Sequence, residues 1–129
     1  MGKDVVTYVC RRPSPPSNGR MEKVARFHVV RSWGLFKLMA GFGTEPEEQL
    51  FPPRGLPDDL PLFIDTEAMN TPSWLTTPEV EEIAARLPPA HLSNSYSLQT
   101  LLGAMKALDT WCGEHDPGGQ AVLVFFFHG

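Results

Sequence analysis

The chain lacks long apolar runs, paired cysteines and clustered basic residues, and each absence excludes a class of protein. No stretch approaches the ~20 apolar residues that a membrane-spanning helix needs. The two cysteines, Cys10 and Cys112, lie too far apart in sequence for a zinc or redox motif, so each is expected to be a buried free thiol. The longest basic run, Arg11-Arg12, is too short for non-specific nucleic-acid binding.

Signals for export, metal binding and catalysis are also missing. The N-terminal residues MGKDVVTYVCRR have neither the apolar core nor the cleavage site of a secretory signal, which predicts a reducing, cytoplasmic location. The motifs GxSxG, GxGxxG and the P-loop do not occur. The four histidines have no ligand spacing, so the sequence predicts no metal and no cofactor. Binding is therefore expected rather than catalysis.

The composition is that of one ordinary folded domain. The chain has 129 residues, of which 42% are hydrophobic and 20% charged, and its formal net charge is −4. This length can bury one substantial core but not two independent ones. We expect a single globular domain over residues 1–129, with a mobile hairpin tip near residues 12–21, where PSPPSNG gathers strong turn formers.

Strand signals occur at both ends of the chain. Residues 5–11 and 23–31 are rich in β-branched and aromatic types and flank the turn, which predicts a β-hairpin. The run QAVLVFFF at residues 120–127 is apolar on both alternating faces, as in a central strand covered on both sides. Helices on one side cannot cover both faces. The loop at residues 43–73, or a second subunit of a homo-oligomer, is therefore expected on the other face.

Three helices are predicted between the strands, over residues 32–40, 76–87 and 97–114. The second has the clearest start, because TTPE offers a capping box with proline in the first turn. Residues 43–73 are expected to form a loop with at most one helical turn. The predicted fold class is α+β, with an antiparallel sheet formed by the N-terminal hairpin and the C-terminal strand, and about three helices packed on it.

Arg54 is the leading candidate for a binding residue. The sequence PPRGLP stiffens the backbone on both sides of it, so less entropy is lost when its guanidinium group binds an anion. An alternative remains open, in which Arg54 pairs with Asp58, Asp59 or a nearby carbonyl group and only fixes the loop.

Aromatic residues could form a pocket wall beside the arginines. Such a wall would suit a flat or phosphate-bearing ligand, through stacking and bidentate hydrogen bonds. The alternative is that these aromatic side chains pack in the core. No catalytic residues are predicted. The predicted ligand-binding residues are Arg31, Trp33, Phe36, Arg54, Gly55, Ser73 and Trp74.

Five segments occur in a recognisable order: DVVTYVCRR, RFHVVRSWGLFKLMAG, PPRGLPDD, SWLT and AVLVFFF. In these segments the chain resembles a family of small uncharacterised proteins of tailed phages and prophages, and the likeness covers nearly its whole length. Many members have a histidine-serine-histidine-serine stretch before W/Y-L-T, where this chain has Asn70-Thr71-Pro72-Ser73. A metal or acid-base role for that stretch therefore could not operate here. The match falls on Arg31, Trp33, Leu35, Phe36, Pro53, Gly55, Leu56, Pro57 and Asp59.

The resemblance implies, by analogy, a phage accessory protein that is not an enzyme and that acts in counter-defence or host modulation. Such a viral protein would sequester a nucleotide-like small molecule or a host protein in the host cytoplasm, without binding a membrane. Two alternatives remain open. One is a small metal-dependent hydrolase or nuclease built around Asp65, Glu67 and His28, and the other is a virion or assembly component that acts as an oligomer.

Overall fold

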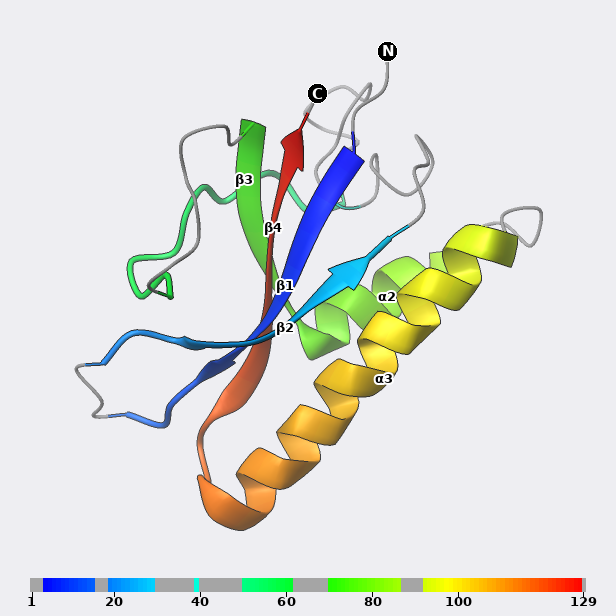
Figure 1. Cartoon of the computed structure of the whole chain (residues 1–129). Helices are drawn as coiled ribbons and strands as arrows, with labels where there is room; N and C mark the ends of the chain where they lie inside the picture. The colour runs from blue at the N-terminus through cyan, green and yellow to red at the C-terminus, as the bar shows by residue number, and fades with distance from the viewer. Residues whose placement is uncertain are drawn as a thin grey trace.

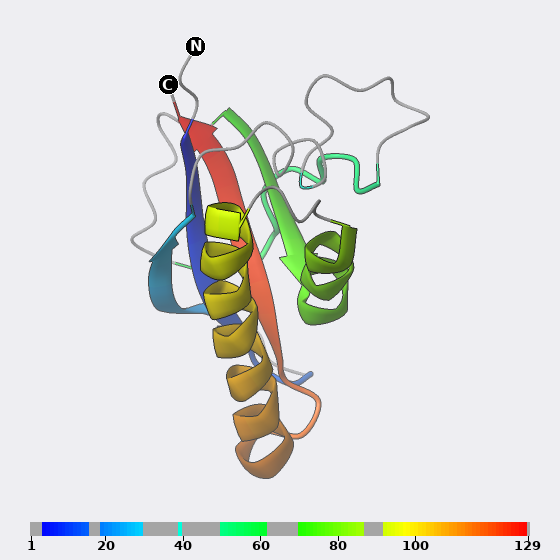
Figure 2. The ribbon, with the colours of Figure 1, turned by 90° about the vertical axis from the view of Figure 1, so that its right-hand side faces the viewer.

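The computed structural model describes residues 4–15, 19–29, 39, 50–61, 70–86 and 92–128. Within these ranges, β1 (Asp4–Arg12), β2 (Glu22–His28), β3 (Asn70–Thr76) and β4 (Gln120–His128) form one antiparallel sheet in the order β2-β1-β4-β3. The helices α2 (Thr77–Arg86) and α3 (Leu92–His115) pack on one face of this sheet (Figure 1, Figure 2). β1 and β4 pair along their whole length, so both ends of the described chain lie close together.

Two parts of the predicted architecture are wrong, although the structure fits the α+β class. The sheet is not limited to the hairpin and the C-terminal strand, because β3, from the middle of the chain, is its fourth strand. The described ranges contain two helices instead of about three. The helix predicted over residues 32–40 falls outside these ranges except for Met39, which is buried. None of the helices in the described residues is long and apolar enough to cross a membrane.

β3 contradicts the loop predicted over residues 43–73, because its first four residues are part of a strand. The loop was predicted because the sequence of β3, NTPSWLT, contains turn formers in its first half. β3 is an edge strand, and its register with β4 shifts between Asn70 and Ser73. Thr71, inside this irregularity, has a φ of 49°. Edge strands and bulges tolerate proline because no ladder hydrogen bond is needed from its nitrogen. Pro72 is accommodated in this way, and regular pairing begins at Ser73.

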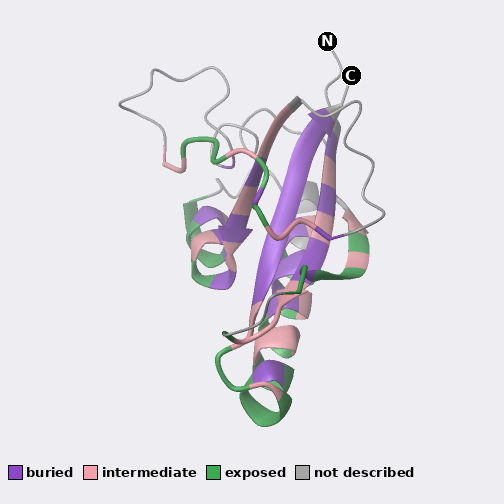
Figure 3. Ribbon diagram, turned by 90° about the vertical axis from the view of Figure 1, so that its left-hand side faces the viewer, coloured by how far each residue is buried: buried purple, intermediate pink, exposed green. Residues whose placement is uncertain are grey.

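β4 is the central strand that its two apolar faces predict, and residues 121–127 are all buried. Its odd-numbered side chains pack in a cluster with residues of α2 and α3. Val122 and Val124 belong to a second cluster on the opposite face, against which Leu60 and Trp74 pack. Residues 50–61, which we call the crossing segment, begin with Leu50 and Phe51 against the first cluster and then run across this second face (Figure 3). The crossing segment, which belongs to the predicted loop, therefore covers part of this second face.

The starts of α2 and β4 are fixed by side-chain oxygens. At the start of α2, Oε1 of Glu79 accepts hydrogen bonds from the backbone nitrogen and the hydroxyl of Thr76, at 2.9 and 3.0 Å. This confirms that Glu79 acts as the predicted capping residue. In α3, which begins five residues earlier than predicted, Asp109 accepts hydrogen bonds from Oγ1 of Thr77 at 2.5 Å and from the backbone nitrogen of Ala121 at 2.7 Å. Asp109 therefore joins α2, α3 and β4.

Candidate functional site

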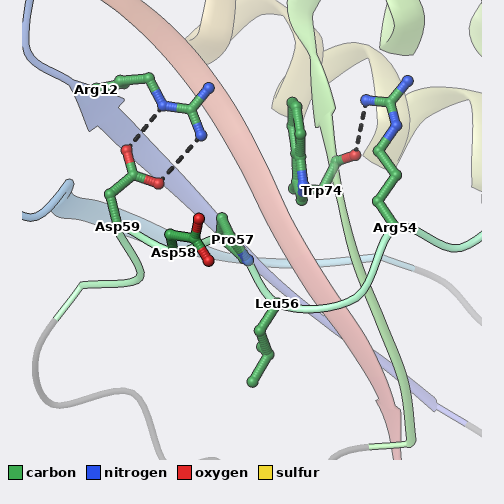
Figure 4. Close-up of a pocket in the computed structure, with 7 residues that line it drawn as sticks. All are labelled: Arg12, Arg54, Leu56, Pro57, Asp58, Asp59 and Trp74. Carbon is green, nitrogen blue, oxygen red and sulfur yellow. Dashed lines mark hydrogen bonds and ion pairs between the residues drawn. The ribbon is translucent and has the colours of Figure 1, made fainter.

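An open hollow of about 400 Å³ lies where the crossing segment meets the sheet (Figure 4). Ligand pockets typically have volumes of about 300–1,000 Å³, so a small molecule is the appropriate size of occupant. The ends of β1 and β3 supply part of the lining, and the crossing segment supplies the rest. The lining residues are Arg12, Arg54, Leu56, Pro57, Asp58, Asp59 and Trp74.

The crossing segment reaches the hollow by running along the outer edge of β3. The backbone nitrogen of Arg54 donates to Oγ of Ser73 at 2.9 Å, and that of Gly55 donates to the carbonyl oxygen of Pro72 at 3.0 Å. Gly55 has a φ of 77°, a conformation that glycine adopts without strain. Nη1 of Arg54 also donates to the carbonyl oxygen of Trp74 at 3.1 Å. The predicted residues Arg54, Gly55, Ser73 and Trp74 are therefore brought together.

The guanidinium group of Arg54 is held by Glu79, the residue that caps α2. Nη1 of Arg54 lies 2.8 Å from Oε1 of Glu79, and Nη2 pairs with Oε2, so the contact is bidentate. Neither Asp58 nor Asp59, the carboxylates named in the sequence-based alternative, forms this pair, but the carbonyl contact named in the same alternative is made, with Trp74. The hydrogen bonds from Arg54 are the main reason why the pKa of Glu79 lies below its ordinary value. Arg54 keeps 31% of its side chain exposed.

Arg12, at the end of β1, is a second arginine of the hollow that the sequence did not identify. Its Nε donates to Oδ2 of Asp59 at 2.8 Å, and its Nη2 donates to Oδ1 at 3.2 Å. Strand alternation would place Arg12 on the same face as Tyr8 and Cys10. Strand alternation alone did not identify Arg12 as a site residue. The hollow also needs Trp74, and Trp74 is brought to this face by β3, a strand that was not predicted.

Trp74 lies between the two arginine side chains, as Figure 4 shows. The centroid of its ring is 5.1 Å from Cζ of Arg12 and 4.6 Å from Cζ of Arg54. Cation–π attraction at these distances helps to hold both guanidinium groups in place. The indole therefore acts as a support for the arginines, and a ligand would meet the guanidinium edges.

Each arginine has a second pair of donors directed away from its carboxylate partner. A guanidinium group has five N–H donors in a planar arrangement. Asp59 contacts Nε and Nη2 of Arg12. The N–H groups on the other edge of this guanidinium, formed by Nη1 and Nη2, point away from Asp59. Glu79 contacts Nη1 and Nη2 of Arg54, which leaves the edge that contains Nε. A phosphate or carboxylate group can bind such an edge through two hydrogen bonds.

The charges that line the hollow cancel, because two arginines face two aspartates. Glu79 adds a further negative charge beside Arg54. Long-range attraction for a highly charged anion is therefore weak, and affinity would depend on directed hydrogen bonds at short range. A singly charged phosphodiester suits this balance better than a nucleoside triphosphate.

Cys10 packs in the same cluster as Trp74, on the face of the sheet that bears the hollow. Burial, together with the negative charge of Asp59, raises the pKa of its thiol to about 12. The thiol therefore remains protonated at neutral pH and is a poor nucleophile. Both Cys10 and Cys112 are buried free thiols, as predicted.

The remaining predicted site residues fall outside the part of the chain that the structure describes. Arg31, Trp33 and Phe36 lie outside the described residues, as do Asp65 and Glu67 of the hydrolase alternative and the side chain of His28. Among the side chains that are described, no group of three or more His, Cys, Asp or Glu residues could hold a metal ion. In comparisons with known proteins, no family model, no curated protein and no solved structure matched the chain.

Replacement of Glu79 by glutamine is expected to make stability less dependent on pH. The pKa of Glu79 is lowered by folding, so its carboxylate stabilises the protein above the ordinary value of 4.5, and this contribution is lost as the pH falls through the lowered value. At neutral pH, we expect Glu79→Gln to reduce the free energy of unfolding by about 1–2 kcal/mol. In acid, below the lowered pKa, the difference from the wild type should shrink.

Urea denaturation at neutral and acidic pH would measure this change. Glu82→Gln is the matched control, because Glu82 pairs with Arg86 on the exposed side of the same helix. Its effect should be below about 0.5 kcal/mol at both pH values. An equal loss of stability for Glu79→Gln at both pH values would contradict the assignment of the shift to this carboxylate.

Proposed function

We propose that this protein is a phage-type accessory protein, not an enzyme, that captures a small nucleotide-like anion in the hollow beside Trp74. Counter-defence or host modulation by ligand sequestration is the role that the family resemblance implies. One observation supports this proposal above the others. Arg12 and Arg54 lie on either side of Trp74, each is held by a carboxylate, and each has a second donor edge.

The carboxylates reduce the entropic cost of binding. A free arginine side chain loses rotamer freedom when it orders around a ligand. Arg12 is already ordered by Asp59 and Trp74, and Arg54 by Glu79 and Trp74. A phosphodiester group would accept two hydrogen bonds from one of the remaining donor edges. The partly apolar rim formed by Leu56 and Pro57 would contact the sugar or the base.

Calorimetric titration with 3′,5′-cyclic mononucleotides and cyclic dinucleotides would test the proposal. The wild type is expected to bind at least one of them. Arg12→Lys keeps the charge but removes the two-donor edge, so it should weaken binding by on the order of tenfold. Arg86→Ala is the matched control, because it removes an arginine that pairs with Glu82 on α2, apart from the hollow.

Two outcomes would count against the proposal. One is an absence of binding heat with all of these nucleotides, and the other is an equal loss of affinity in Arg12→Lys and Arg86→Ala. Thermal unfolding of each variant would show whether a loss of affinity reflects a loss of fold. Nucleoside triphosphates should bind more weakly than cyclic nucleotides, because the lining of the hollow has no net positive charge.

A further inference from the structure

We infer that the hollow selects guanine over adenine, with Asp58 as the residue that recognises the base. This inference rests on the proposed function, because it assumes that a nucleotide binds beside Arg12 and Arg54. Asp58 lines the hollow and has an exposed side chain. It belongs to the turn in which the backbone nitrogen of Leu60 donates to the carbonyl oxygen of Pro57 at 3.3 Å.

The two neighbouring aspartates have different roles in the hollow. Both oxygens of Asp59 are used by Arg12. No ion pair joins Asp58 to an arginine or lysine among the described residues, although both arginines also line the hollow. An ionised carboxylate only accepts hydrogen bonds, so Asp58 is complementary to a group with two adjacent donors.

Guanine is the common purine with such a group. Its N1–H and its exocyclic amino group lie side by side and can donate to both oxygens of one carboxylate. Adenine places an amino donor next to the lone pair of N1, and that lone pair is repelled by a carboxylate. Binding of a guanine nucleotide therefore uses Asp58, whereas binding of an adenine nucleotide leaves it without a matching partner.

The arrangement of the charged groups fits a ligand with donors at one end and an anion at the other. Asp58 precedes Asp59 in the chain, and Asp59 fixes Arg12 of β1, so the base-recognising carboxylate is next in sequence to the carboxylate that orients the phosphate-binding arginine. Leu56, of which 41% is exposed, and Pro57 add apolar surface to the same hollow. A single nucleotide can therefore be held at its base and at its phosphate within the same hollow.

Titration with cyclic GMP, cyclic IMP and cyclic AMP would test this inference. Cyclic IMP keeps N1–H but lacks the amino group, so its affinity should lie between those of the other two. We expect cyclic GMP to bind the wild type on the order of tenfold more tightly than cyclic AMP, which corresponds to one decade in the dissociation constant. Asp58→Asn should abolish or reverse this preference, because an amide group can donate to N1 of adenine while it accepts from the amino group.

Glu81→Gln is the control, because Glu81 is an exposed carboxylate that pairs with Lys106 away from the hollow. It should leave the preference unchanged. If cyclic GMP and cyclic AMP bind the wild type equally, or if Asp58→Asn keeps the guanine preference, the inference is overturned while the proposed function stands. If none of the three nucleotides nor any cyclic dinucleotide binds, both are overturned.

Discussion

Phe125→Ala is expected to lower the free energy of unfolding by about 3–5 kcal/mol. Phe125 lies at the centre of β4 and is 0% exposed. Its neighbours across the sheet are Thr7 on β1 and Ser73 on β3, both small and both buried. These small side chains leave room for the large ring between them, so its removal would create a cavity in the middle of the sheet.

The surroundings cannot easily close this cavity, because both neighbours are tied to other segments. Oγ1 of Thr7 donates to the carbonyl oxygen of Phe27 at 2.6 Å, and Oγ of Ser73 accepts from the backbone nitrogen of Arg54 at 2.9 Å. The ring of Phe125 also makes an edge-on contact with that of Phe127, with centroids 6.0 Å apart. A fixed cavity costs more free energy than one that collapses.

Urea denaturation of Phe125→Ala and Phe125→Leu would measure this cost. Leucine fills much of the space, so its loss should be roughly half that of alanine. Val24→Ala is the control for an exposed position on β2, and it should change the free energy of unfolding by less than about 0.5 kcal/mol. A loss for Phe125→Ala no larger than that for Phe125→Leu would show that the neighbours move to fill the space.

Asp109→Ala is expected to cost about 2–4 kcal/mol, because one carboxylate satisfies donors on two other elements. Its oxygens accept hydrogen bonds from Oγ1 of Thr77, at the start of α2, and from the backbone nitrogen of Ala121, at the start of β4. Both Thr77 and Ala121 are buried. Removal of the carboxylate therefore leaves two donors without this acceptor in places that water reaches poorly.

Hydrogen exchange at the Ala121 amide, measured together with urea denaturation, would test the role of Asp109. Asp109→Asn retains one acceptor oxygen and should cost less than alanine. Glu114→Ala is the control on the same helix, because the side chain of Glu114 is 71% exposed and should contribute little. Unchanged protection of the Ala121 amide in Asp109→Ala, relative to the rest of the sheet, would contradict this role.

The elements that the sequence predicted correctly are those with a strong local pattern. The alternation in β1 and β2, the apolar run of β4 and the TTPE start of α2 all depend on residues close in sequence. β3 has no such pattern, since its first residues favour turns. Its strand conformation depends on pairing with β4 and on an edge position that tolerates Pro72, and neither is visible before the sheet is assembled.

The candidate site was predictable to a similar extent. The proline-rich sequence around Arg54 predicted a binding residue in what proved to be the crossing segment. The aromatic character of Trp74 predicted that it would form a wall of the binding pocket. The partnership of Arg54 with Glu79 was missed, because these residues are 25 positions apart and Glu79 already had a local explanation as a helix cap. Arg12 was missed for the same reason, because its contacts with Asp59 and Trp74 are made only in the folded chain.

The bonds between the crossing segment and β3 also limit how the sheet can associate with other molecules. An uncovered edge strand presents carbonyl and amide groups that can pair with a strand of another chain. In β3, the carbonyl oxygens of Pro72 and Trp74 already accept hydrogen bonds from Gly55 and Arg54. Growth of the sheet by intermolecular β-augmentation is therefore blocked along this stretch unless residues 54 and 55 first detach.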